Sequence, residues 1–247
     1  MSGKEQINRF QNLNAWFHSS HGSFVAKAIE DELSHLNAIL RGDRLVQLGG
    51  CADNAWLTGL QFKHKWLFTP QIKPNKISCS TLFNSLPIDR ESLDCVIAPF
   101  TVDAFDLDLK DTVIDEIDRV LKPMGHVVIL GVNPVSLWGM WLKFSRKNCF
   151  GVGKGSPKSV LSIKRSLIHR GYMHCYYNGF YFIPPVSQEK LIHTLAFLNQ
   201  VGKMISPTPS AFYCLVMQKH VENYIEPLFV ESKKDFLKRS PAYQPVC

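Results

Sequence analysis

The stretch from residue 86 to residue 134 constrains the fold most. An apolar run at 95–98 is bounded by Asp94 and Pro99, as expected of a strand buried on both faces. Apolar residues then recur with the 3.6-residue period of a helix, and a second apolar run at 127–130 ends at Gly131. The helical period is carried by Val113, Ile114, Ile117, Val120 and Leu121. Strand, helix and strand in this order predict two parallel strands joined by a right-handed crossover.

Two segments of this stretch carry a family resemblance. Residues 86–97 read LP-x5-LDCVI, and residues 118–131 read DRVLKPMGHVVILG. Together they resemble the second half of a class I S-adenosylmethionine-dependent methyltransferase domain of the type 11 group. Residues 131–141, GVNPVSLWGMW, resemble more narrowly one bacterial subgroup with an NP-x-SLWG segment. The resemblance extends over residues 42–134. It implies S-adenosylmethionine as cofactor and an α/β fold with a doubly wound, mostly parallel, seven-stranded Rossmann-like sheet.

The same resemblance predicts the organisation of the chain. We expect one class I methyltransferase-like domain over residues 1–230. Helical periodicity predicts N-terminal helices within residues 4–41, with Ser23 as the N-cap candidate of the second, and an inserted cap is expected at residues 133–160. Residues 231–247 form a basic tail that contains prolines and is expected to be mobile.

A glycine turn follows the first predicted strand, residues 44–48. Glycine lets the backbone turn sharply and approach a cofactor without a Cβ clash. By resemblance, Gln47 stands where the family has an acid, Gly49 matches the first glycine of its loop, and Cys51 and Asp53 replace the other two. The loop is therefore degenerate, and a glycine-poor turn with no ligand is the alternative interpretation.

Three further segments are expected to complete the cofactor site. The second strand, residues 65–68, is followed by Thr69 and Pro70 instead of the family's ribose-binding acid. Leu82 stands where the family often has an adenine-binding acid, although main-chain groups of Leu82 and Phe83 can serve. The fourth strand leads to the sheet edge where open α/β sheets bind ligands. The expected cofactor-binding residues are Gln47, Gly49, Gly50, Cys51, Thr69, Leu82, Phe83, Pro99, Phe100 and Thr101.

No catalytic residue is singled out by the sequence. Asp103, Asp106 and Asp108 follow the fourth strand and are either helix-start residues or include a general base. Methyl transfer needs little acid–base help, since positioning supplies much of the rate.

Composition narrows the class of protein. Of 247 residues, 45% are hydrophobic and 20% are charged, as in ordinary soluble globular proteins. The sequence has no apolar run of about 18 residues, as a membrane span needs, and no signal-peptide pattern at its start. Its seven cysteines lack CxxC spacing, so we expect free thiols in a reducing cytoplasm and no metal site.

The basic residues are unevenly placed. The formal net charge is +7, and many Lys and Arg residues crowd residues 143–170 and 233–239. This pattern indicates either a solvated basic face or a surface for nucleic acid or acidic lipid. The neighbouring Trp138 and Trp141 belong to a lid over the substrate site, a packed crossover helix, or a helix on a membrane surface.

Two classes of function follow from the sequence. The first is methyl transfer from S-adenosylmethionine to an acceptor that the sequence does not identify. The alternative is a catalytically inactive methyltransferase-fold protein that serves as a binding or scaffold module, indicated by the degenerate loop. A nicotinamide dehydrogenase is a weaker third interpretation, since the chain lacks GxGxxG and its last strand is expected to be antiparallel.

Overall fold

The computed structural model describes residues 3–50, 54–70, 79–104, 107–144, 157–186, 188–204 and 209–220. The strands are β1 Arg44–Leu48, β2 His64–Thr69, β3 Cys79–Ser80, β4 Leu93–Pro99, β5 Leu121–Val132, β6 Tyr172–Phe180 and β7 Phe212–Lys219. The helices are α1 Gly3–Phe17, α2 Ser20–His35, α3 Trp56–Gly59, α4 Leu107–Val120, α5 Leu137–Phe144, α6 Val160–Ile168, α7 Glu189–Thr194 and α8 Leu198–Met204. Short 3-10 turns occupy Leu36–Ala38, Val102–Ala104 and Leu195–Phe197.

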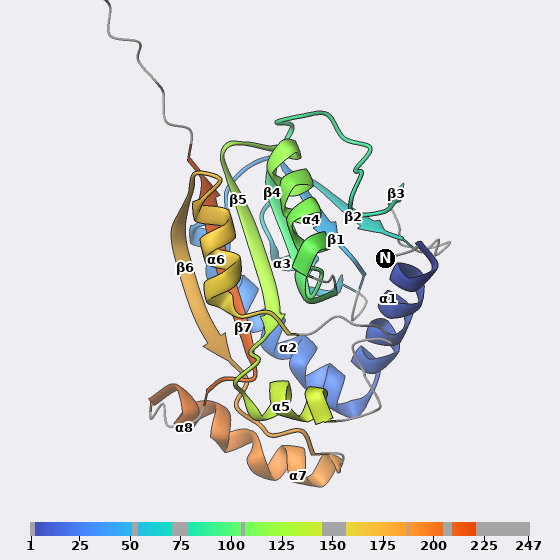
Figure 1. The fold of residues 1–247 in the computed structure, drawn as a ribbon. Helices are drawn as coiled ribbons and strands as arrows, with labels where there is room; N and C mark the ends of the chain where they lie inside the picture. The colour runs from blue at the N-terminus through green and yellow to red at the C-terminus, as the bar shows by residue number, and fades with distance from the viewer. Residues whose placement is uncertain are drawn as a thin grey trace, which may run out of the picture.

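All the strands join in one seven-stranded sheet with the order β3-β2-β1-β4-β5-β7-β6. The pairs from β3 to β5 are parallel, whereas β7 runs antiparallel to both β5 and β6. Along the chain, β2 and β3 are added on one side of β1, whereas β4 is added on its other side (Figure 1). The strand order therefore reverses at β1. The predicted doubly wound, mostly parallel sheet is confirmed.

Helices cover both faces of the sheet (Figure 1). In that view α4 and α6 lie in front of the strands, whereas α2 and α3 lie behind them. Helices α5, α7 and α8 lie at the lower edge, where β5 ends, and α1 runs along the right side. Helices therefore cover both faces of the sheet and also the edge where β5 ends.

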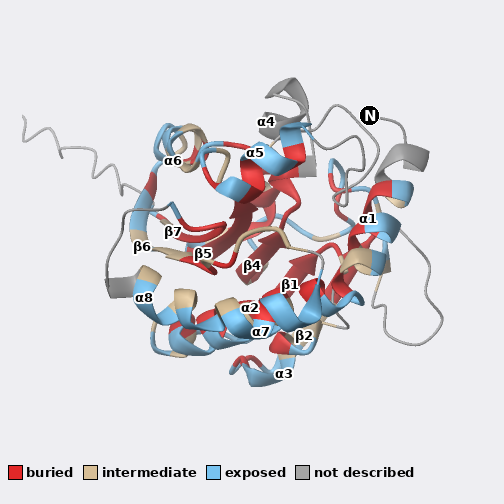
Figure 2. Cartoon of the chain, turned by 90° about the horizontal axis from the view of Figure 1, so that it is seen from below, coloured by how far each residue is buried: buried red, intermediate tan, exposed pale blue. Residues whose placement is uncertain are grey.

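The core is the sheet itself. Val46, Val96, Ile97 and Val127 have no exposed surface, and the central strands are buried along their length when seen from below (Figure 2). Strands covered on both faces need continuous apolar runs, which explains why β4 and β5 were recognisable from sequence.

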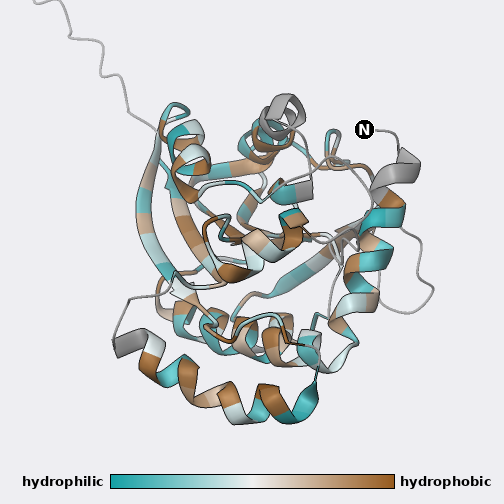
Figure 3. Ribbon diagram, turned by 60° about the horizontal axis from the view of Figure 1, so that its bottom comes forward, coloured by the Kyte–Doolittle hydropathy of each residue, from teal (hydrophilic) through white to brown (hydrophobic). Residues whose placement is uncertain are grey.

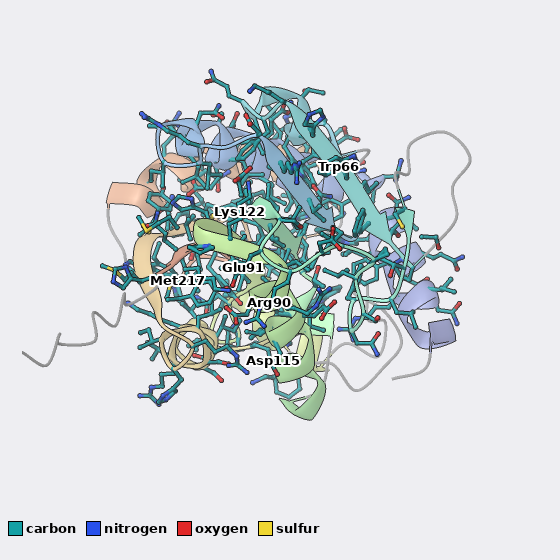
Figure 4. The ribbon with its side chains drawn as sticks, turned by 90° about the horizontal axis from the view of Figure 1, so that it is seen from above. Trp66, Arg90, Glu91, Asp115, Lys122 and Met217 are labelled. Carbon is teal, nitrogen blue, oxygen red and sulfur yellow. The ribbon has the colours of Figure 1, made fainter. Side chains whose placement is uncertain are left out.

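One carboxylate ties three strands together at the opposite edge. Asp94, which opens β4, accepts hydrogen bonds from the main-chain N–H groups of Asp43 and Arg44, both at 2.9 Å. It also pairs with Lys122 at 2.6 Å, near the middle of the view from above in Figure 4, where Trp66 marks β2 further out. The acid at the start of this strand therefore aligns β1, β4 and β5.

Several element boundaries differ from the predicted ones. Ser19, not Ser23, caps α2, since its hydroxyl oxygen accepts the Gly22 N–H, and His21 lies in the first turn. Strand β3 is only two residues long. Strand β5 begins at Leu121, before the predicted apolar run at 127–130. Its first part is irregular, because the register against β4 shifts between Leu93 and Cys95. The tail, residues 231–247, and much of the predicted cap lie outside the described residues.

Candidate cofactor site

The carboxyl ends of β1, β2 and β4 lie side by side. Leu48 pairs with Phe68, and Gln47 pairs with Ile97. The turn after β1 remains bonded to its neighbour, because the Gly49 N–H donates to the Phe68 carbonyl at 2.7 Å. The parallel register thus brings the predicted residues of these three strand ends to one edge. Cys51, and with it Asp53, lies outside the described residues.

Gln47 holds the glycine turn from inside the sheet. The residue is fully buried, and its Nε2 donates to the Gly49 carbonyl at 2.8 Å and to Asn54 Oδ1 at 2.6 Å. Its Oε1 accepts the Trp56 indole N–H at 2.8 Å. An acid at this position has no N–H to donate. The amide therefore suits this turn, and a direct bond from Gln47 to a cofactor stays a prediction.

Gly49 requires the freedom of glycine for two reasons. Its φ is +92°, and a Cβ there would collide with the ring of Phe10 from α1. Phe10 is buried and packs edge to face on Phe83, with ring centroids 5.2 Å apart. Gly50 is more open, since a Cβ there would meet its nearest side chain, Leu67, at 3.6 Å. The two aromatic rings thus occupy one side of the turn.

The end of β4 is held in a strained conformation. Phe100 adopts φ +55°, which is uncommon for a non-glycine residue and concentrates at functional sites. Its N–H donates to the Leu130 carbonyl at 2.7 Å. The Thr101 hydroxyl, fully buried, donates to the Leu48 carbonyl at 2.7 Å. Pro99, the last residue of β4, is buried beside them. These bonds fix the ends of β1 and β4 relative to each other.

The end of β2 carries the hydroxyl of Thr69 at the place where the resemblance led us to expect a ribose-binding carboxylate. Thr69 is almost completely buried, and its carbonyl accepts the Thr81 N–H at 3.0 Å. Leu82 follows β3 and is 39% exposed, whereas its neighbour Phe83 is fully buried. The structure therefore places Thr69 and the Leu82–Phe83 main chain near this edge.

Asp103 is a buried carboxylate behind the end of β4. Its Oδ2 accepts the Val132 N–H at 2.9 Å, and its Oδ1 accepts the Lys158 N–H at 2.8 Å. Burial raises its pKa to about 6, although these hydrogen bonds and the charge of Arg9 act in the opposite direction. The Asp103 carbonyl also accepts a hydrogen bond from Arg9 of α1 at 2.9 Å. With both carboxylate oxygens bonded to main-chain N–H groups, Asp103 is a structural clamp and not a base facing a substrate.

Sequence reasoning missed a cavity at this edge. It has a volume of about 280 Å³ and lies between the α1–α2 corner, α5 and residues 185–186. Trp16, His21, Trp138 and Trp141 belong to its wall. These residues are far apart in the sequence, so only the tryptophan pair on α5 gave any indication of it.

Comparison with known proteins relates part of this chain to one family. Residues 57–129 match the family model of the methyltransferase domain. Over these residues the chain is similar to a methyltransferase domain. The matched residues begin after the Gly49–Gly50 turn and include β2, β4, α4 and most of β5. No curated protein matches the chain.

Solved methyltransferases share the fold of this chain. An S-adenosylmethionine-dependent methyltransferase from Archaeoglobus fulgidus is 14% identical, with a TM-score of 0.55 over 78% of this chain and 94% of its own. A possible histamine N-methyltransferase from Thermotoga maritima is 16% identical, with a TM-score of 0.54 over 79% of this chain and 91% of its own. The N-methyltransferase NodS from Bradyrhizobium japonicum, in complex with S-adenosylhomocysteine, is 11% identical, with a TM-score of 0.56 over 86% and 98%.

Within the described ranges, no His, Cys, Asp and Glu side chains form a group that can hold a metal ion. Of the helices that the structure describes, none has the length and apolarity to cross a membrane. The four cysteines described, Cys79, Cys95, Cys175 and Cys214, are free thiols.

Proposed function

We propose that the protein transfers a methyl group from S-adenosylmethionine to an acceptor, with the cofactor bound across the ends of β1 and β4. One observation carries this proposal: the Gly49–Gly50 turn and the strained Phe100 lie together at the carboxyl edge of a methyltransferase sheet. Open α/β sheets bind nucleotide-like ligands at that place, where the strand order reverses.

The residues at this edge fit part of the cofactor. The open side of Gly50 leaves room for a ligand close to the backbone, and main-chain groups of Gly49, Gly50 and Phe83 suit an amino acid and an adenine. The Thr69 hydroxyl is our candidate for a hydrogen bond to the ribose. Below the bound cofactor, the site would be lined by Pro99, Phe100 and Thr101. Bound there, the cofactor supplies an electrophilic methyl group on a sulfonium, which leaves as a neutral thioether. The chain's task is then to bind and align the acceptor.

A binding or scaffold role is the second candidate. It is favoured by Phe10, whose ring lies against Gly49 and Phe83, and by the absence of a carboxylate from the last residues of β2, Phe68 and Thr69. A hydrogen bond to a charged partner is worth about 1.5–3 kcal/mol, so its loss weakens cofactor binding by roughly 10–100-fold.

Calorimetric titration with S-adenosylhomocysteine separates the two candidates. We expect binding in the micromolar to high-micromolar range. Gly50→Leu should weaken it at least tenfold, because the added side chain enters the space beside the turn. Gly59→Leu is the matched control, since no atom lies within 4 Å of a Cβ at Gly59, and it should bind like the wild type. Absence of heat with folded protein at millimolar ligand would favour the scaffold.

The setting of the enzyme is part of the same proposal. We infer a single domain over residues 1–230 with its cap at 133–160, in a reducing cytoplasm, as in the bacterial subgroup that shares the NP-x-SLWG segment. The net charge of +7 supports contact with nucleic acid or acidic lipid through the basic segment 143–170. The binding of nucleic acid or of acidic lipid vesicles to the protein should weaken as salt rises from about 50 to about 500 mM. Binding that does not depend on salt would contradict this contact.

A further inference from the structure

Exposed apolar side chains gather at one end of the molecule. Among the described residues, fourteen large hydrophobic side chains are exposed, and eight of them belong to residues 133–144 or 189–204. These eight are Val135, Leu137, Met140, Trp141, Phe144, Leu191, Phe197 and Val201. Figure 1 shows α5, α7 and α8 at the lower edge, and Figure 3, in which that edge comes forward, shows hydrophobic segments on these helices. A concentration of this kind marks a surface that contacts a protein or a membrane.

Helix α5 is apolar on both of its sides. Trp138, Gly139 and Leu142 are buried, and the indole N–H of Trp138 donates to the Ile183 carbonyl at 2.8 Å. The outer residues follow the spacing i, i+3, i+4 and i+7 of one helix side. All of them are exposed: Leu137, Met140, Trp141 and Phe144. A helix that is apolar all round is normally enclosed by protein or by lipid. The outer side of α5 therefore calls for an apolar partner.

The segment between β6 and α7 connects α5 to α8. Phe182 and Pro184 border the same small cleft as Leu137 of α5. The Phe182 N–H donates to Asn199 Oδ1 of α8 at 2.7 Å, and a Cβ at Gly202 of α8 would collide with the Phe182 ring. Helix α5, residues 182–186, α7 and α8 thus form one packed end of the fold, which we call the docking end.

The chain around the docking end is strongly basic. Between Asp118 and Glu189 the sequence has no Asp or Glu but ten Lys and Arg residues. Four of these lie between residues 143 and 154, directly along and after α5. The first of the four, Lys143, is exposed in the last turn of α5, whereas Glu189 and Lys190 of α7 cancel each other. Exposed Trp, Phe and Leu side chains beside Lys and Arg suit an anionic membrane, where apolar groups enter the acyl boundary and cations meet the headgroups.

We propose that the docking end binds an anionic lipid surface, with the outer side of α5 inserted at the boundary between headgroups and acyl chains. The inference rests on the proposed function only in its basic contact, which it assigns to acidic lipid; docking does not need methyl transfer. Nucleic acid fits less well, because the aliphatic side chains of Leu137 and Met140 gain nothing from phosphates. A second copy of this chain carries the same positive charge, which opposes pairing at this surface.

Co-sedimentation with lipid vesicles tests the docking. Vesicles of phosphatidylcholine mixed with phosphatidylglycerol present an anionic surface, and pure phosphatidylcholine presents a neutral one. We expect the wild type to bind the anionic vesicles about tenfold more tightly or better. Leu137→Gln combined with Phe144→Gln should weaken this binding about tenfold or more, because two side chains, 49% and 86% exposed, no longer enter the lipid. Phe144→Gln alone should weaken it about threefold or more.

Ile168→Gln combined with Met173→Gln is the matched control. Both side chains are apolar and exposed, by 49% and 55%. They lie where β6 begins, whereas α5 follows the end of β5. Strands β5 and β6 both run antiparallel to β7 and therefore run in the same direction. The control thus changes the opposite end of the sheet and should bind vesicles like the wild type.

The same proteins give the outcomes that would overturn the docking. Vesicle binding that the α5 double variant retains in full shows charge attraction alone. A wild-type dimer in light scattering that this variant converts to a monomer shows that a second copy covers α5. Loss of single-stranded RNA binding in the variant, with vesicle binding unchanged, assigns the surface to nucleic acid. Each of these results overturns the docking.

Titration with S-adenosylhomocysteine separates this proposal from the proposed function. The α5 double variant should bind it like the wild type, which shows that the fold is intact. A wild type that binds S-adenosylhomocysteine but not anionic vesicles overturns the docking alone. A wild type that binds the vesicles but not S-adenosylhomocysteine overturns the proposed function alone.

Discussion

Gly49 is the residue on which the geometry of the turn depends most directly. Gly49→Ala forces a side chain into a positive φ and against the Phe10 ring, and each effect costs about 1–3 kcal/mol. We expect the free energy of unfolding in urea to fall by about 2–4 kcal/mol. Gly59→Ala, at an open helical position, should change it by less than about 1 kcal/mol or increase it. Equal effects of the two substitutions would contradict this account of the turn.

Asp103 should give stability an unusual dependence on pH. Its pKa rises on folding from 3.8 to about 6, so the folded state binds a proton that the unfolded state has released. The contribution of Asp103 is therefore greatest below about pH 4 and is lost as pH rises through 6. Asp103→Asn should flatten the decline of the unfolding free energy between pH 4 and 6.5. Asp115→Asn, an exposed carboxylate paired with Arg170, should keep the wild-type slope, and an unchanged slope in Asp103→Asn would show that another group is responsible.

At the scale of elements, Asp94 should give stability the opposite dependence on pH. Burial raises its pKa, but the bonds from Lys122, Arg44 and Asp43 outweigh this and lower it overall. Its contribution is therefore present at neutral pH and lost as pH falls below about 4. Asp94→Asn should lower the unfolding free energy at pH 7 by about 1–3 kcal/mol, with a smaller difference at pH 3.5. Asp43→Asn breaks only the exposed pair with Lys63 and should cost under about 1 kcal/mol; a cost as large as that of Asp94→Asn would refute the special role of Asp94.

Elements with long apolar patterns were predictable, and those defined by single contacts were not. Strand β1 has the predicted bounds, and β4 extends the predicted run 95–98 at each end, because strands buried on both faces need uninterrupted apolar residues. The cap of α2 was misplaced, because Ser23 directly precedes the apolar Phe24, whereas the polar residues after Ser19 gave no sign that the helix already begins there. The third strand was expected within residues 75–83, and β3 lies there but spans only two residues, too few to fix its bounds from a pattern.

The candidate site shows the same division. Sequence alignment on a strand brought Gln47, Gly49 and Phe100 to the correct edge, since parallel strands end together. It gave no account of why Gln47 replaces an acid, because that depends on Asn54 and Trp56 as hydrogen-bond partners. The cavity at His21 needs contacts between segments more than 100 residues apart, and no local pattern records them.

At the scale of the whole molecule, α1 closes the edge where the cofactor is proposed to bind. Phe10 packs on Gly49, Arg9 bonds to the Asp103 carbonyl, and Phe17 contacts Phe100 and Trp56. The helix therefore stabilises the fold with the same contacts that limit space beside the turn. Binding and stability should be coupled through α1, because a ligand that needs the place of Phe10 must displace its ring.

Phe10→Ala should therefore lower the melting temperature of the free protein while tightening the binding of S-adenosylhomocysteine about threefold or more. Truncating a buried Phe lowers the free energy of unfolding by about 3–5 kcal/mol. A ligand that binds only the folded state stabilises it by an amount that grows with the ligand concentration relative to Kd. Leu13→Ala is the matched control, since Leu13 is also buried on α1: it should lower the melting temperature without tightening binding. Thermal melts across a ligand series give both quantities for each variant. If Phe10→Ala instead weakens binding, the ring is a wall of the cofactor pocket, and α1 supports the ligand where we expect it to compete.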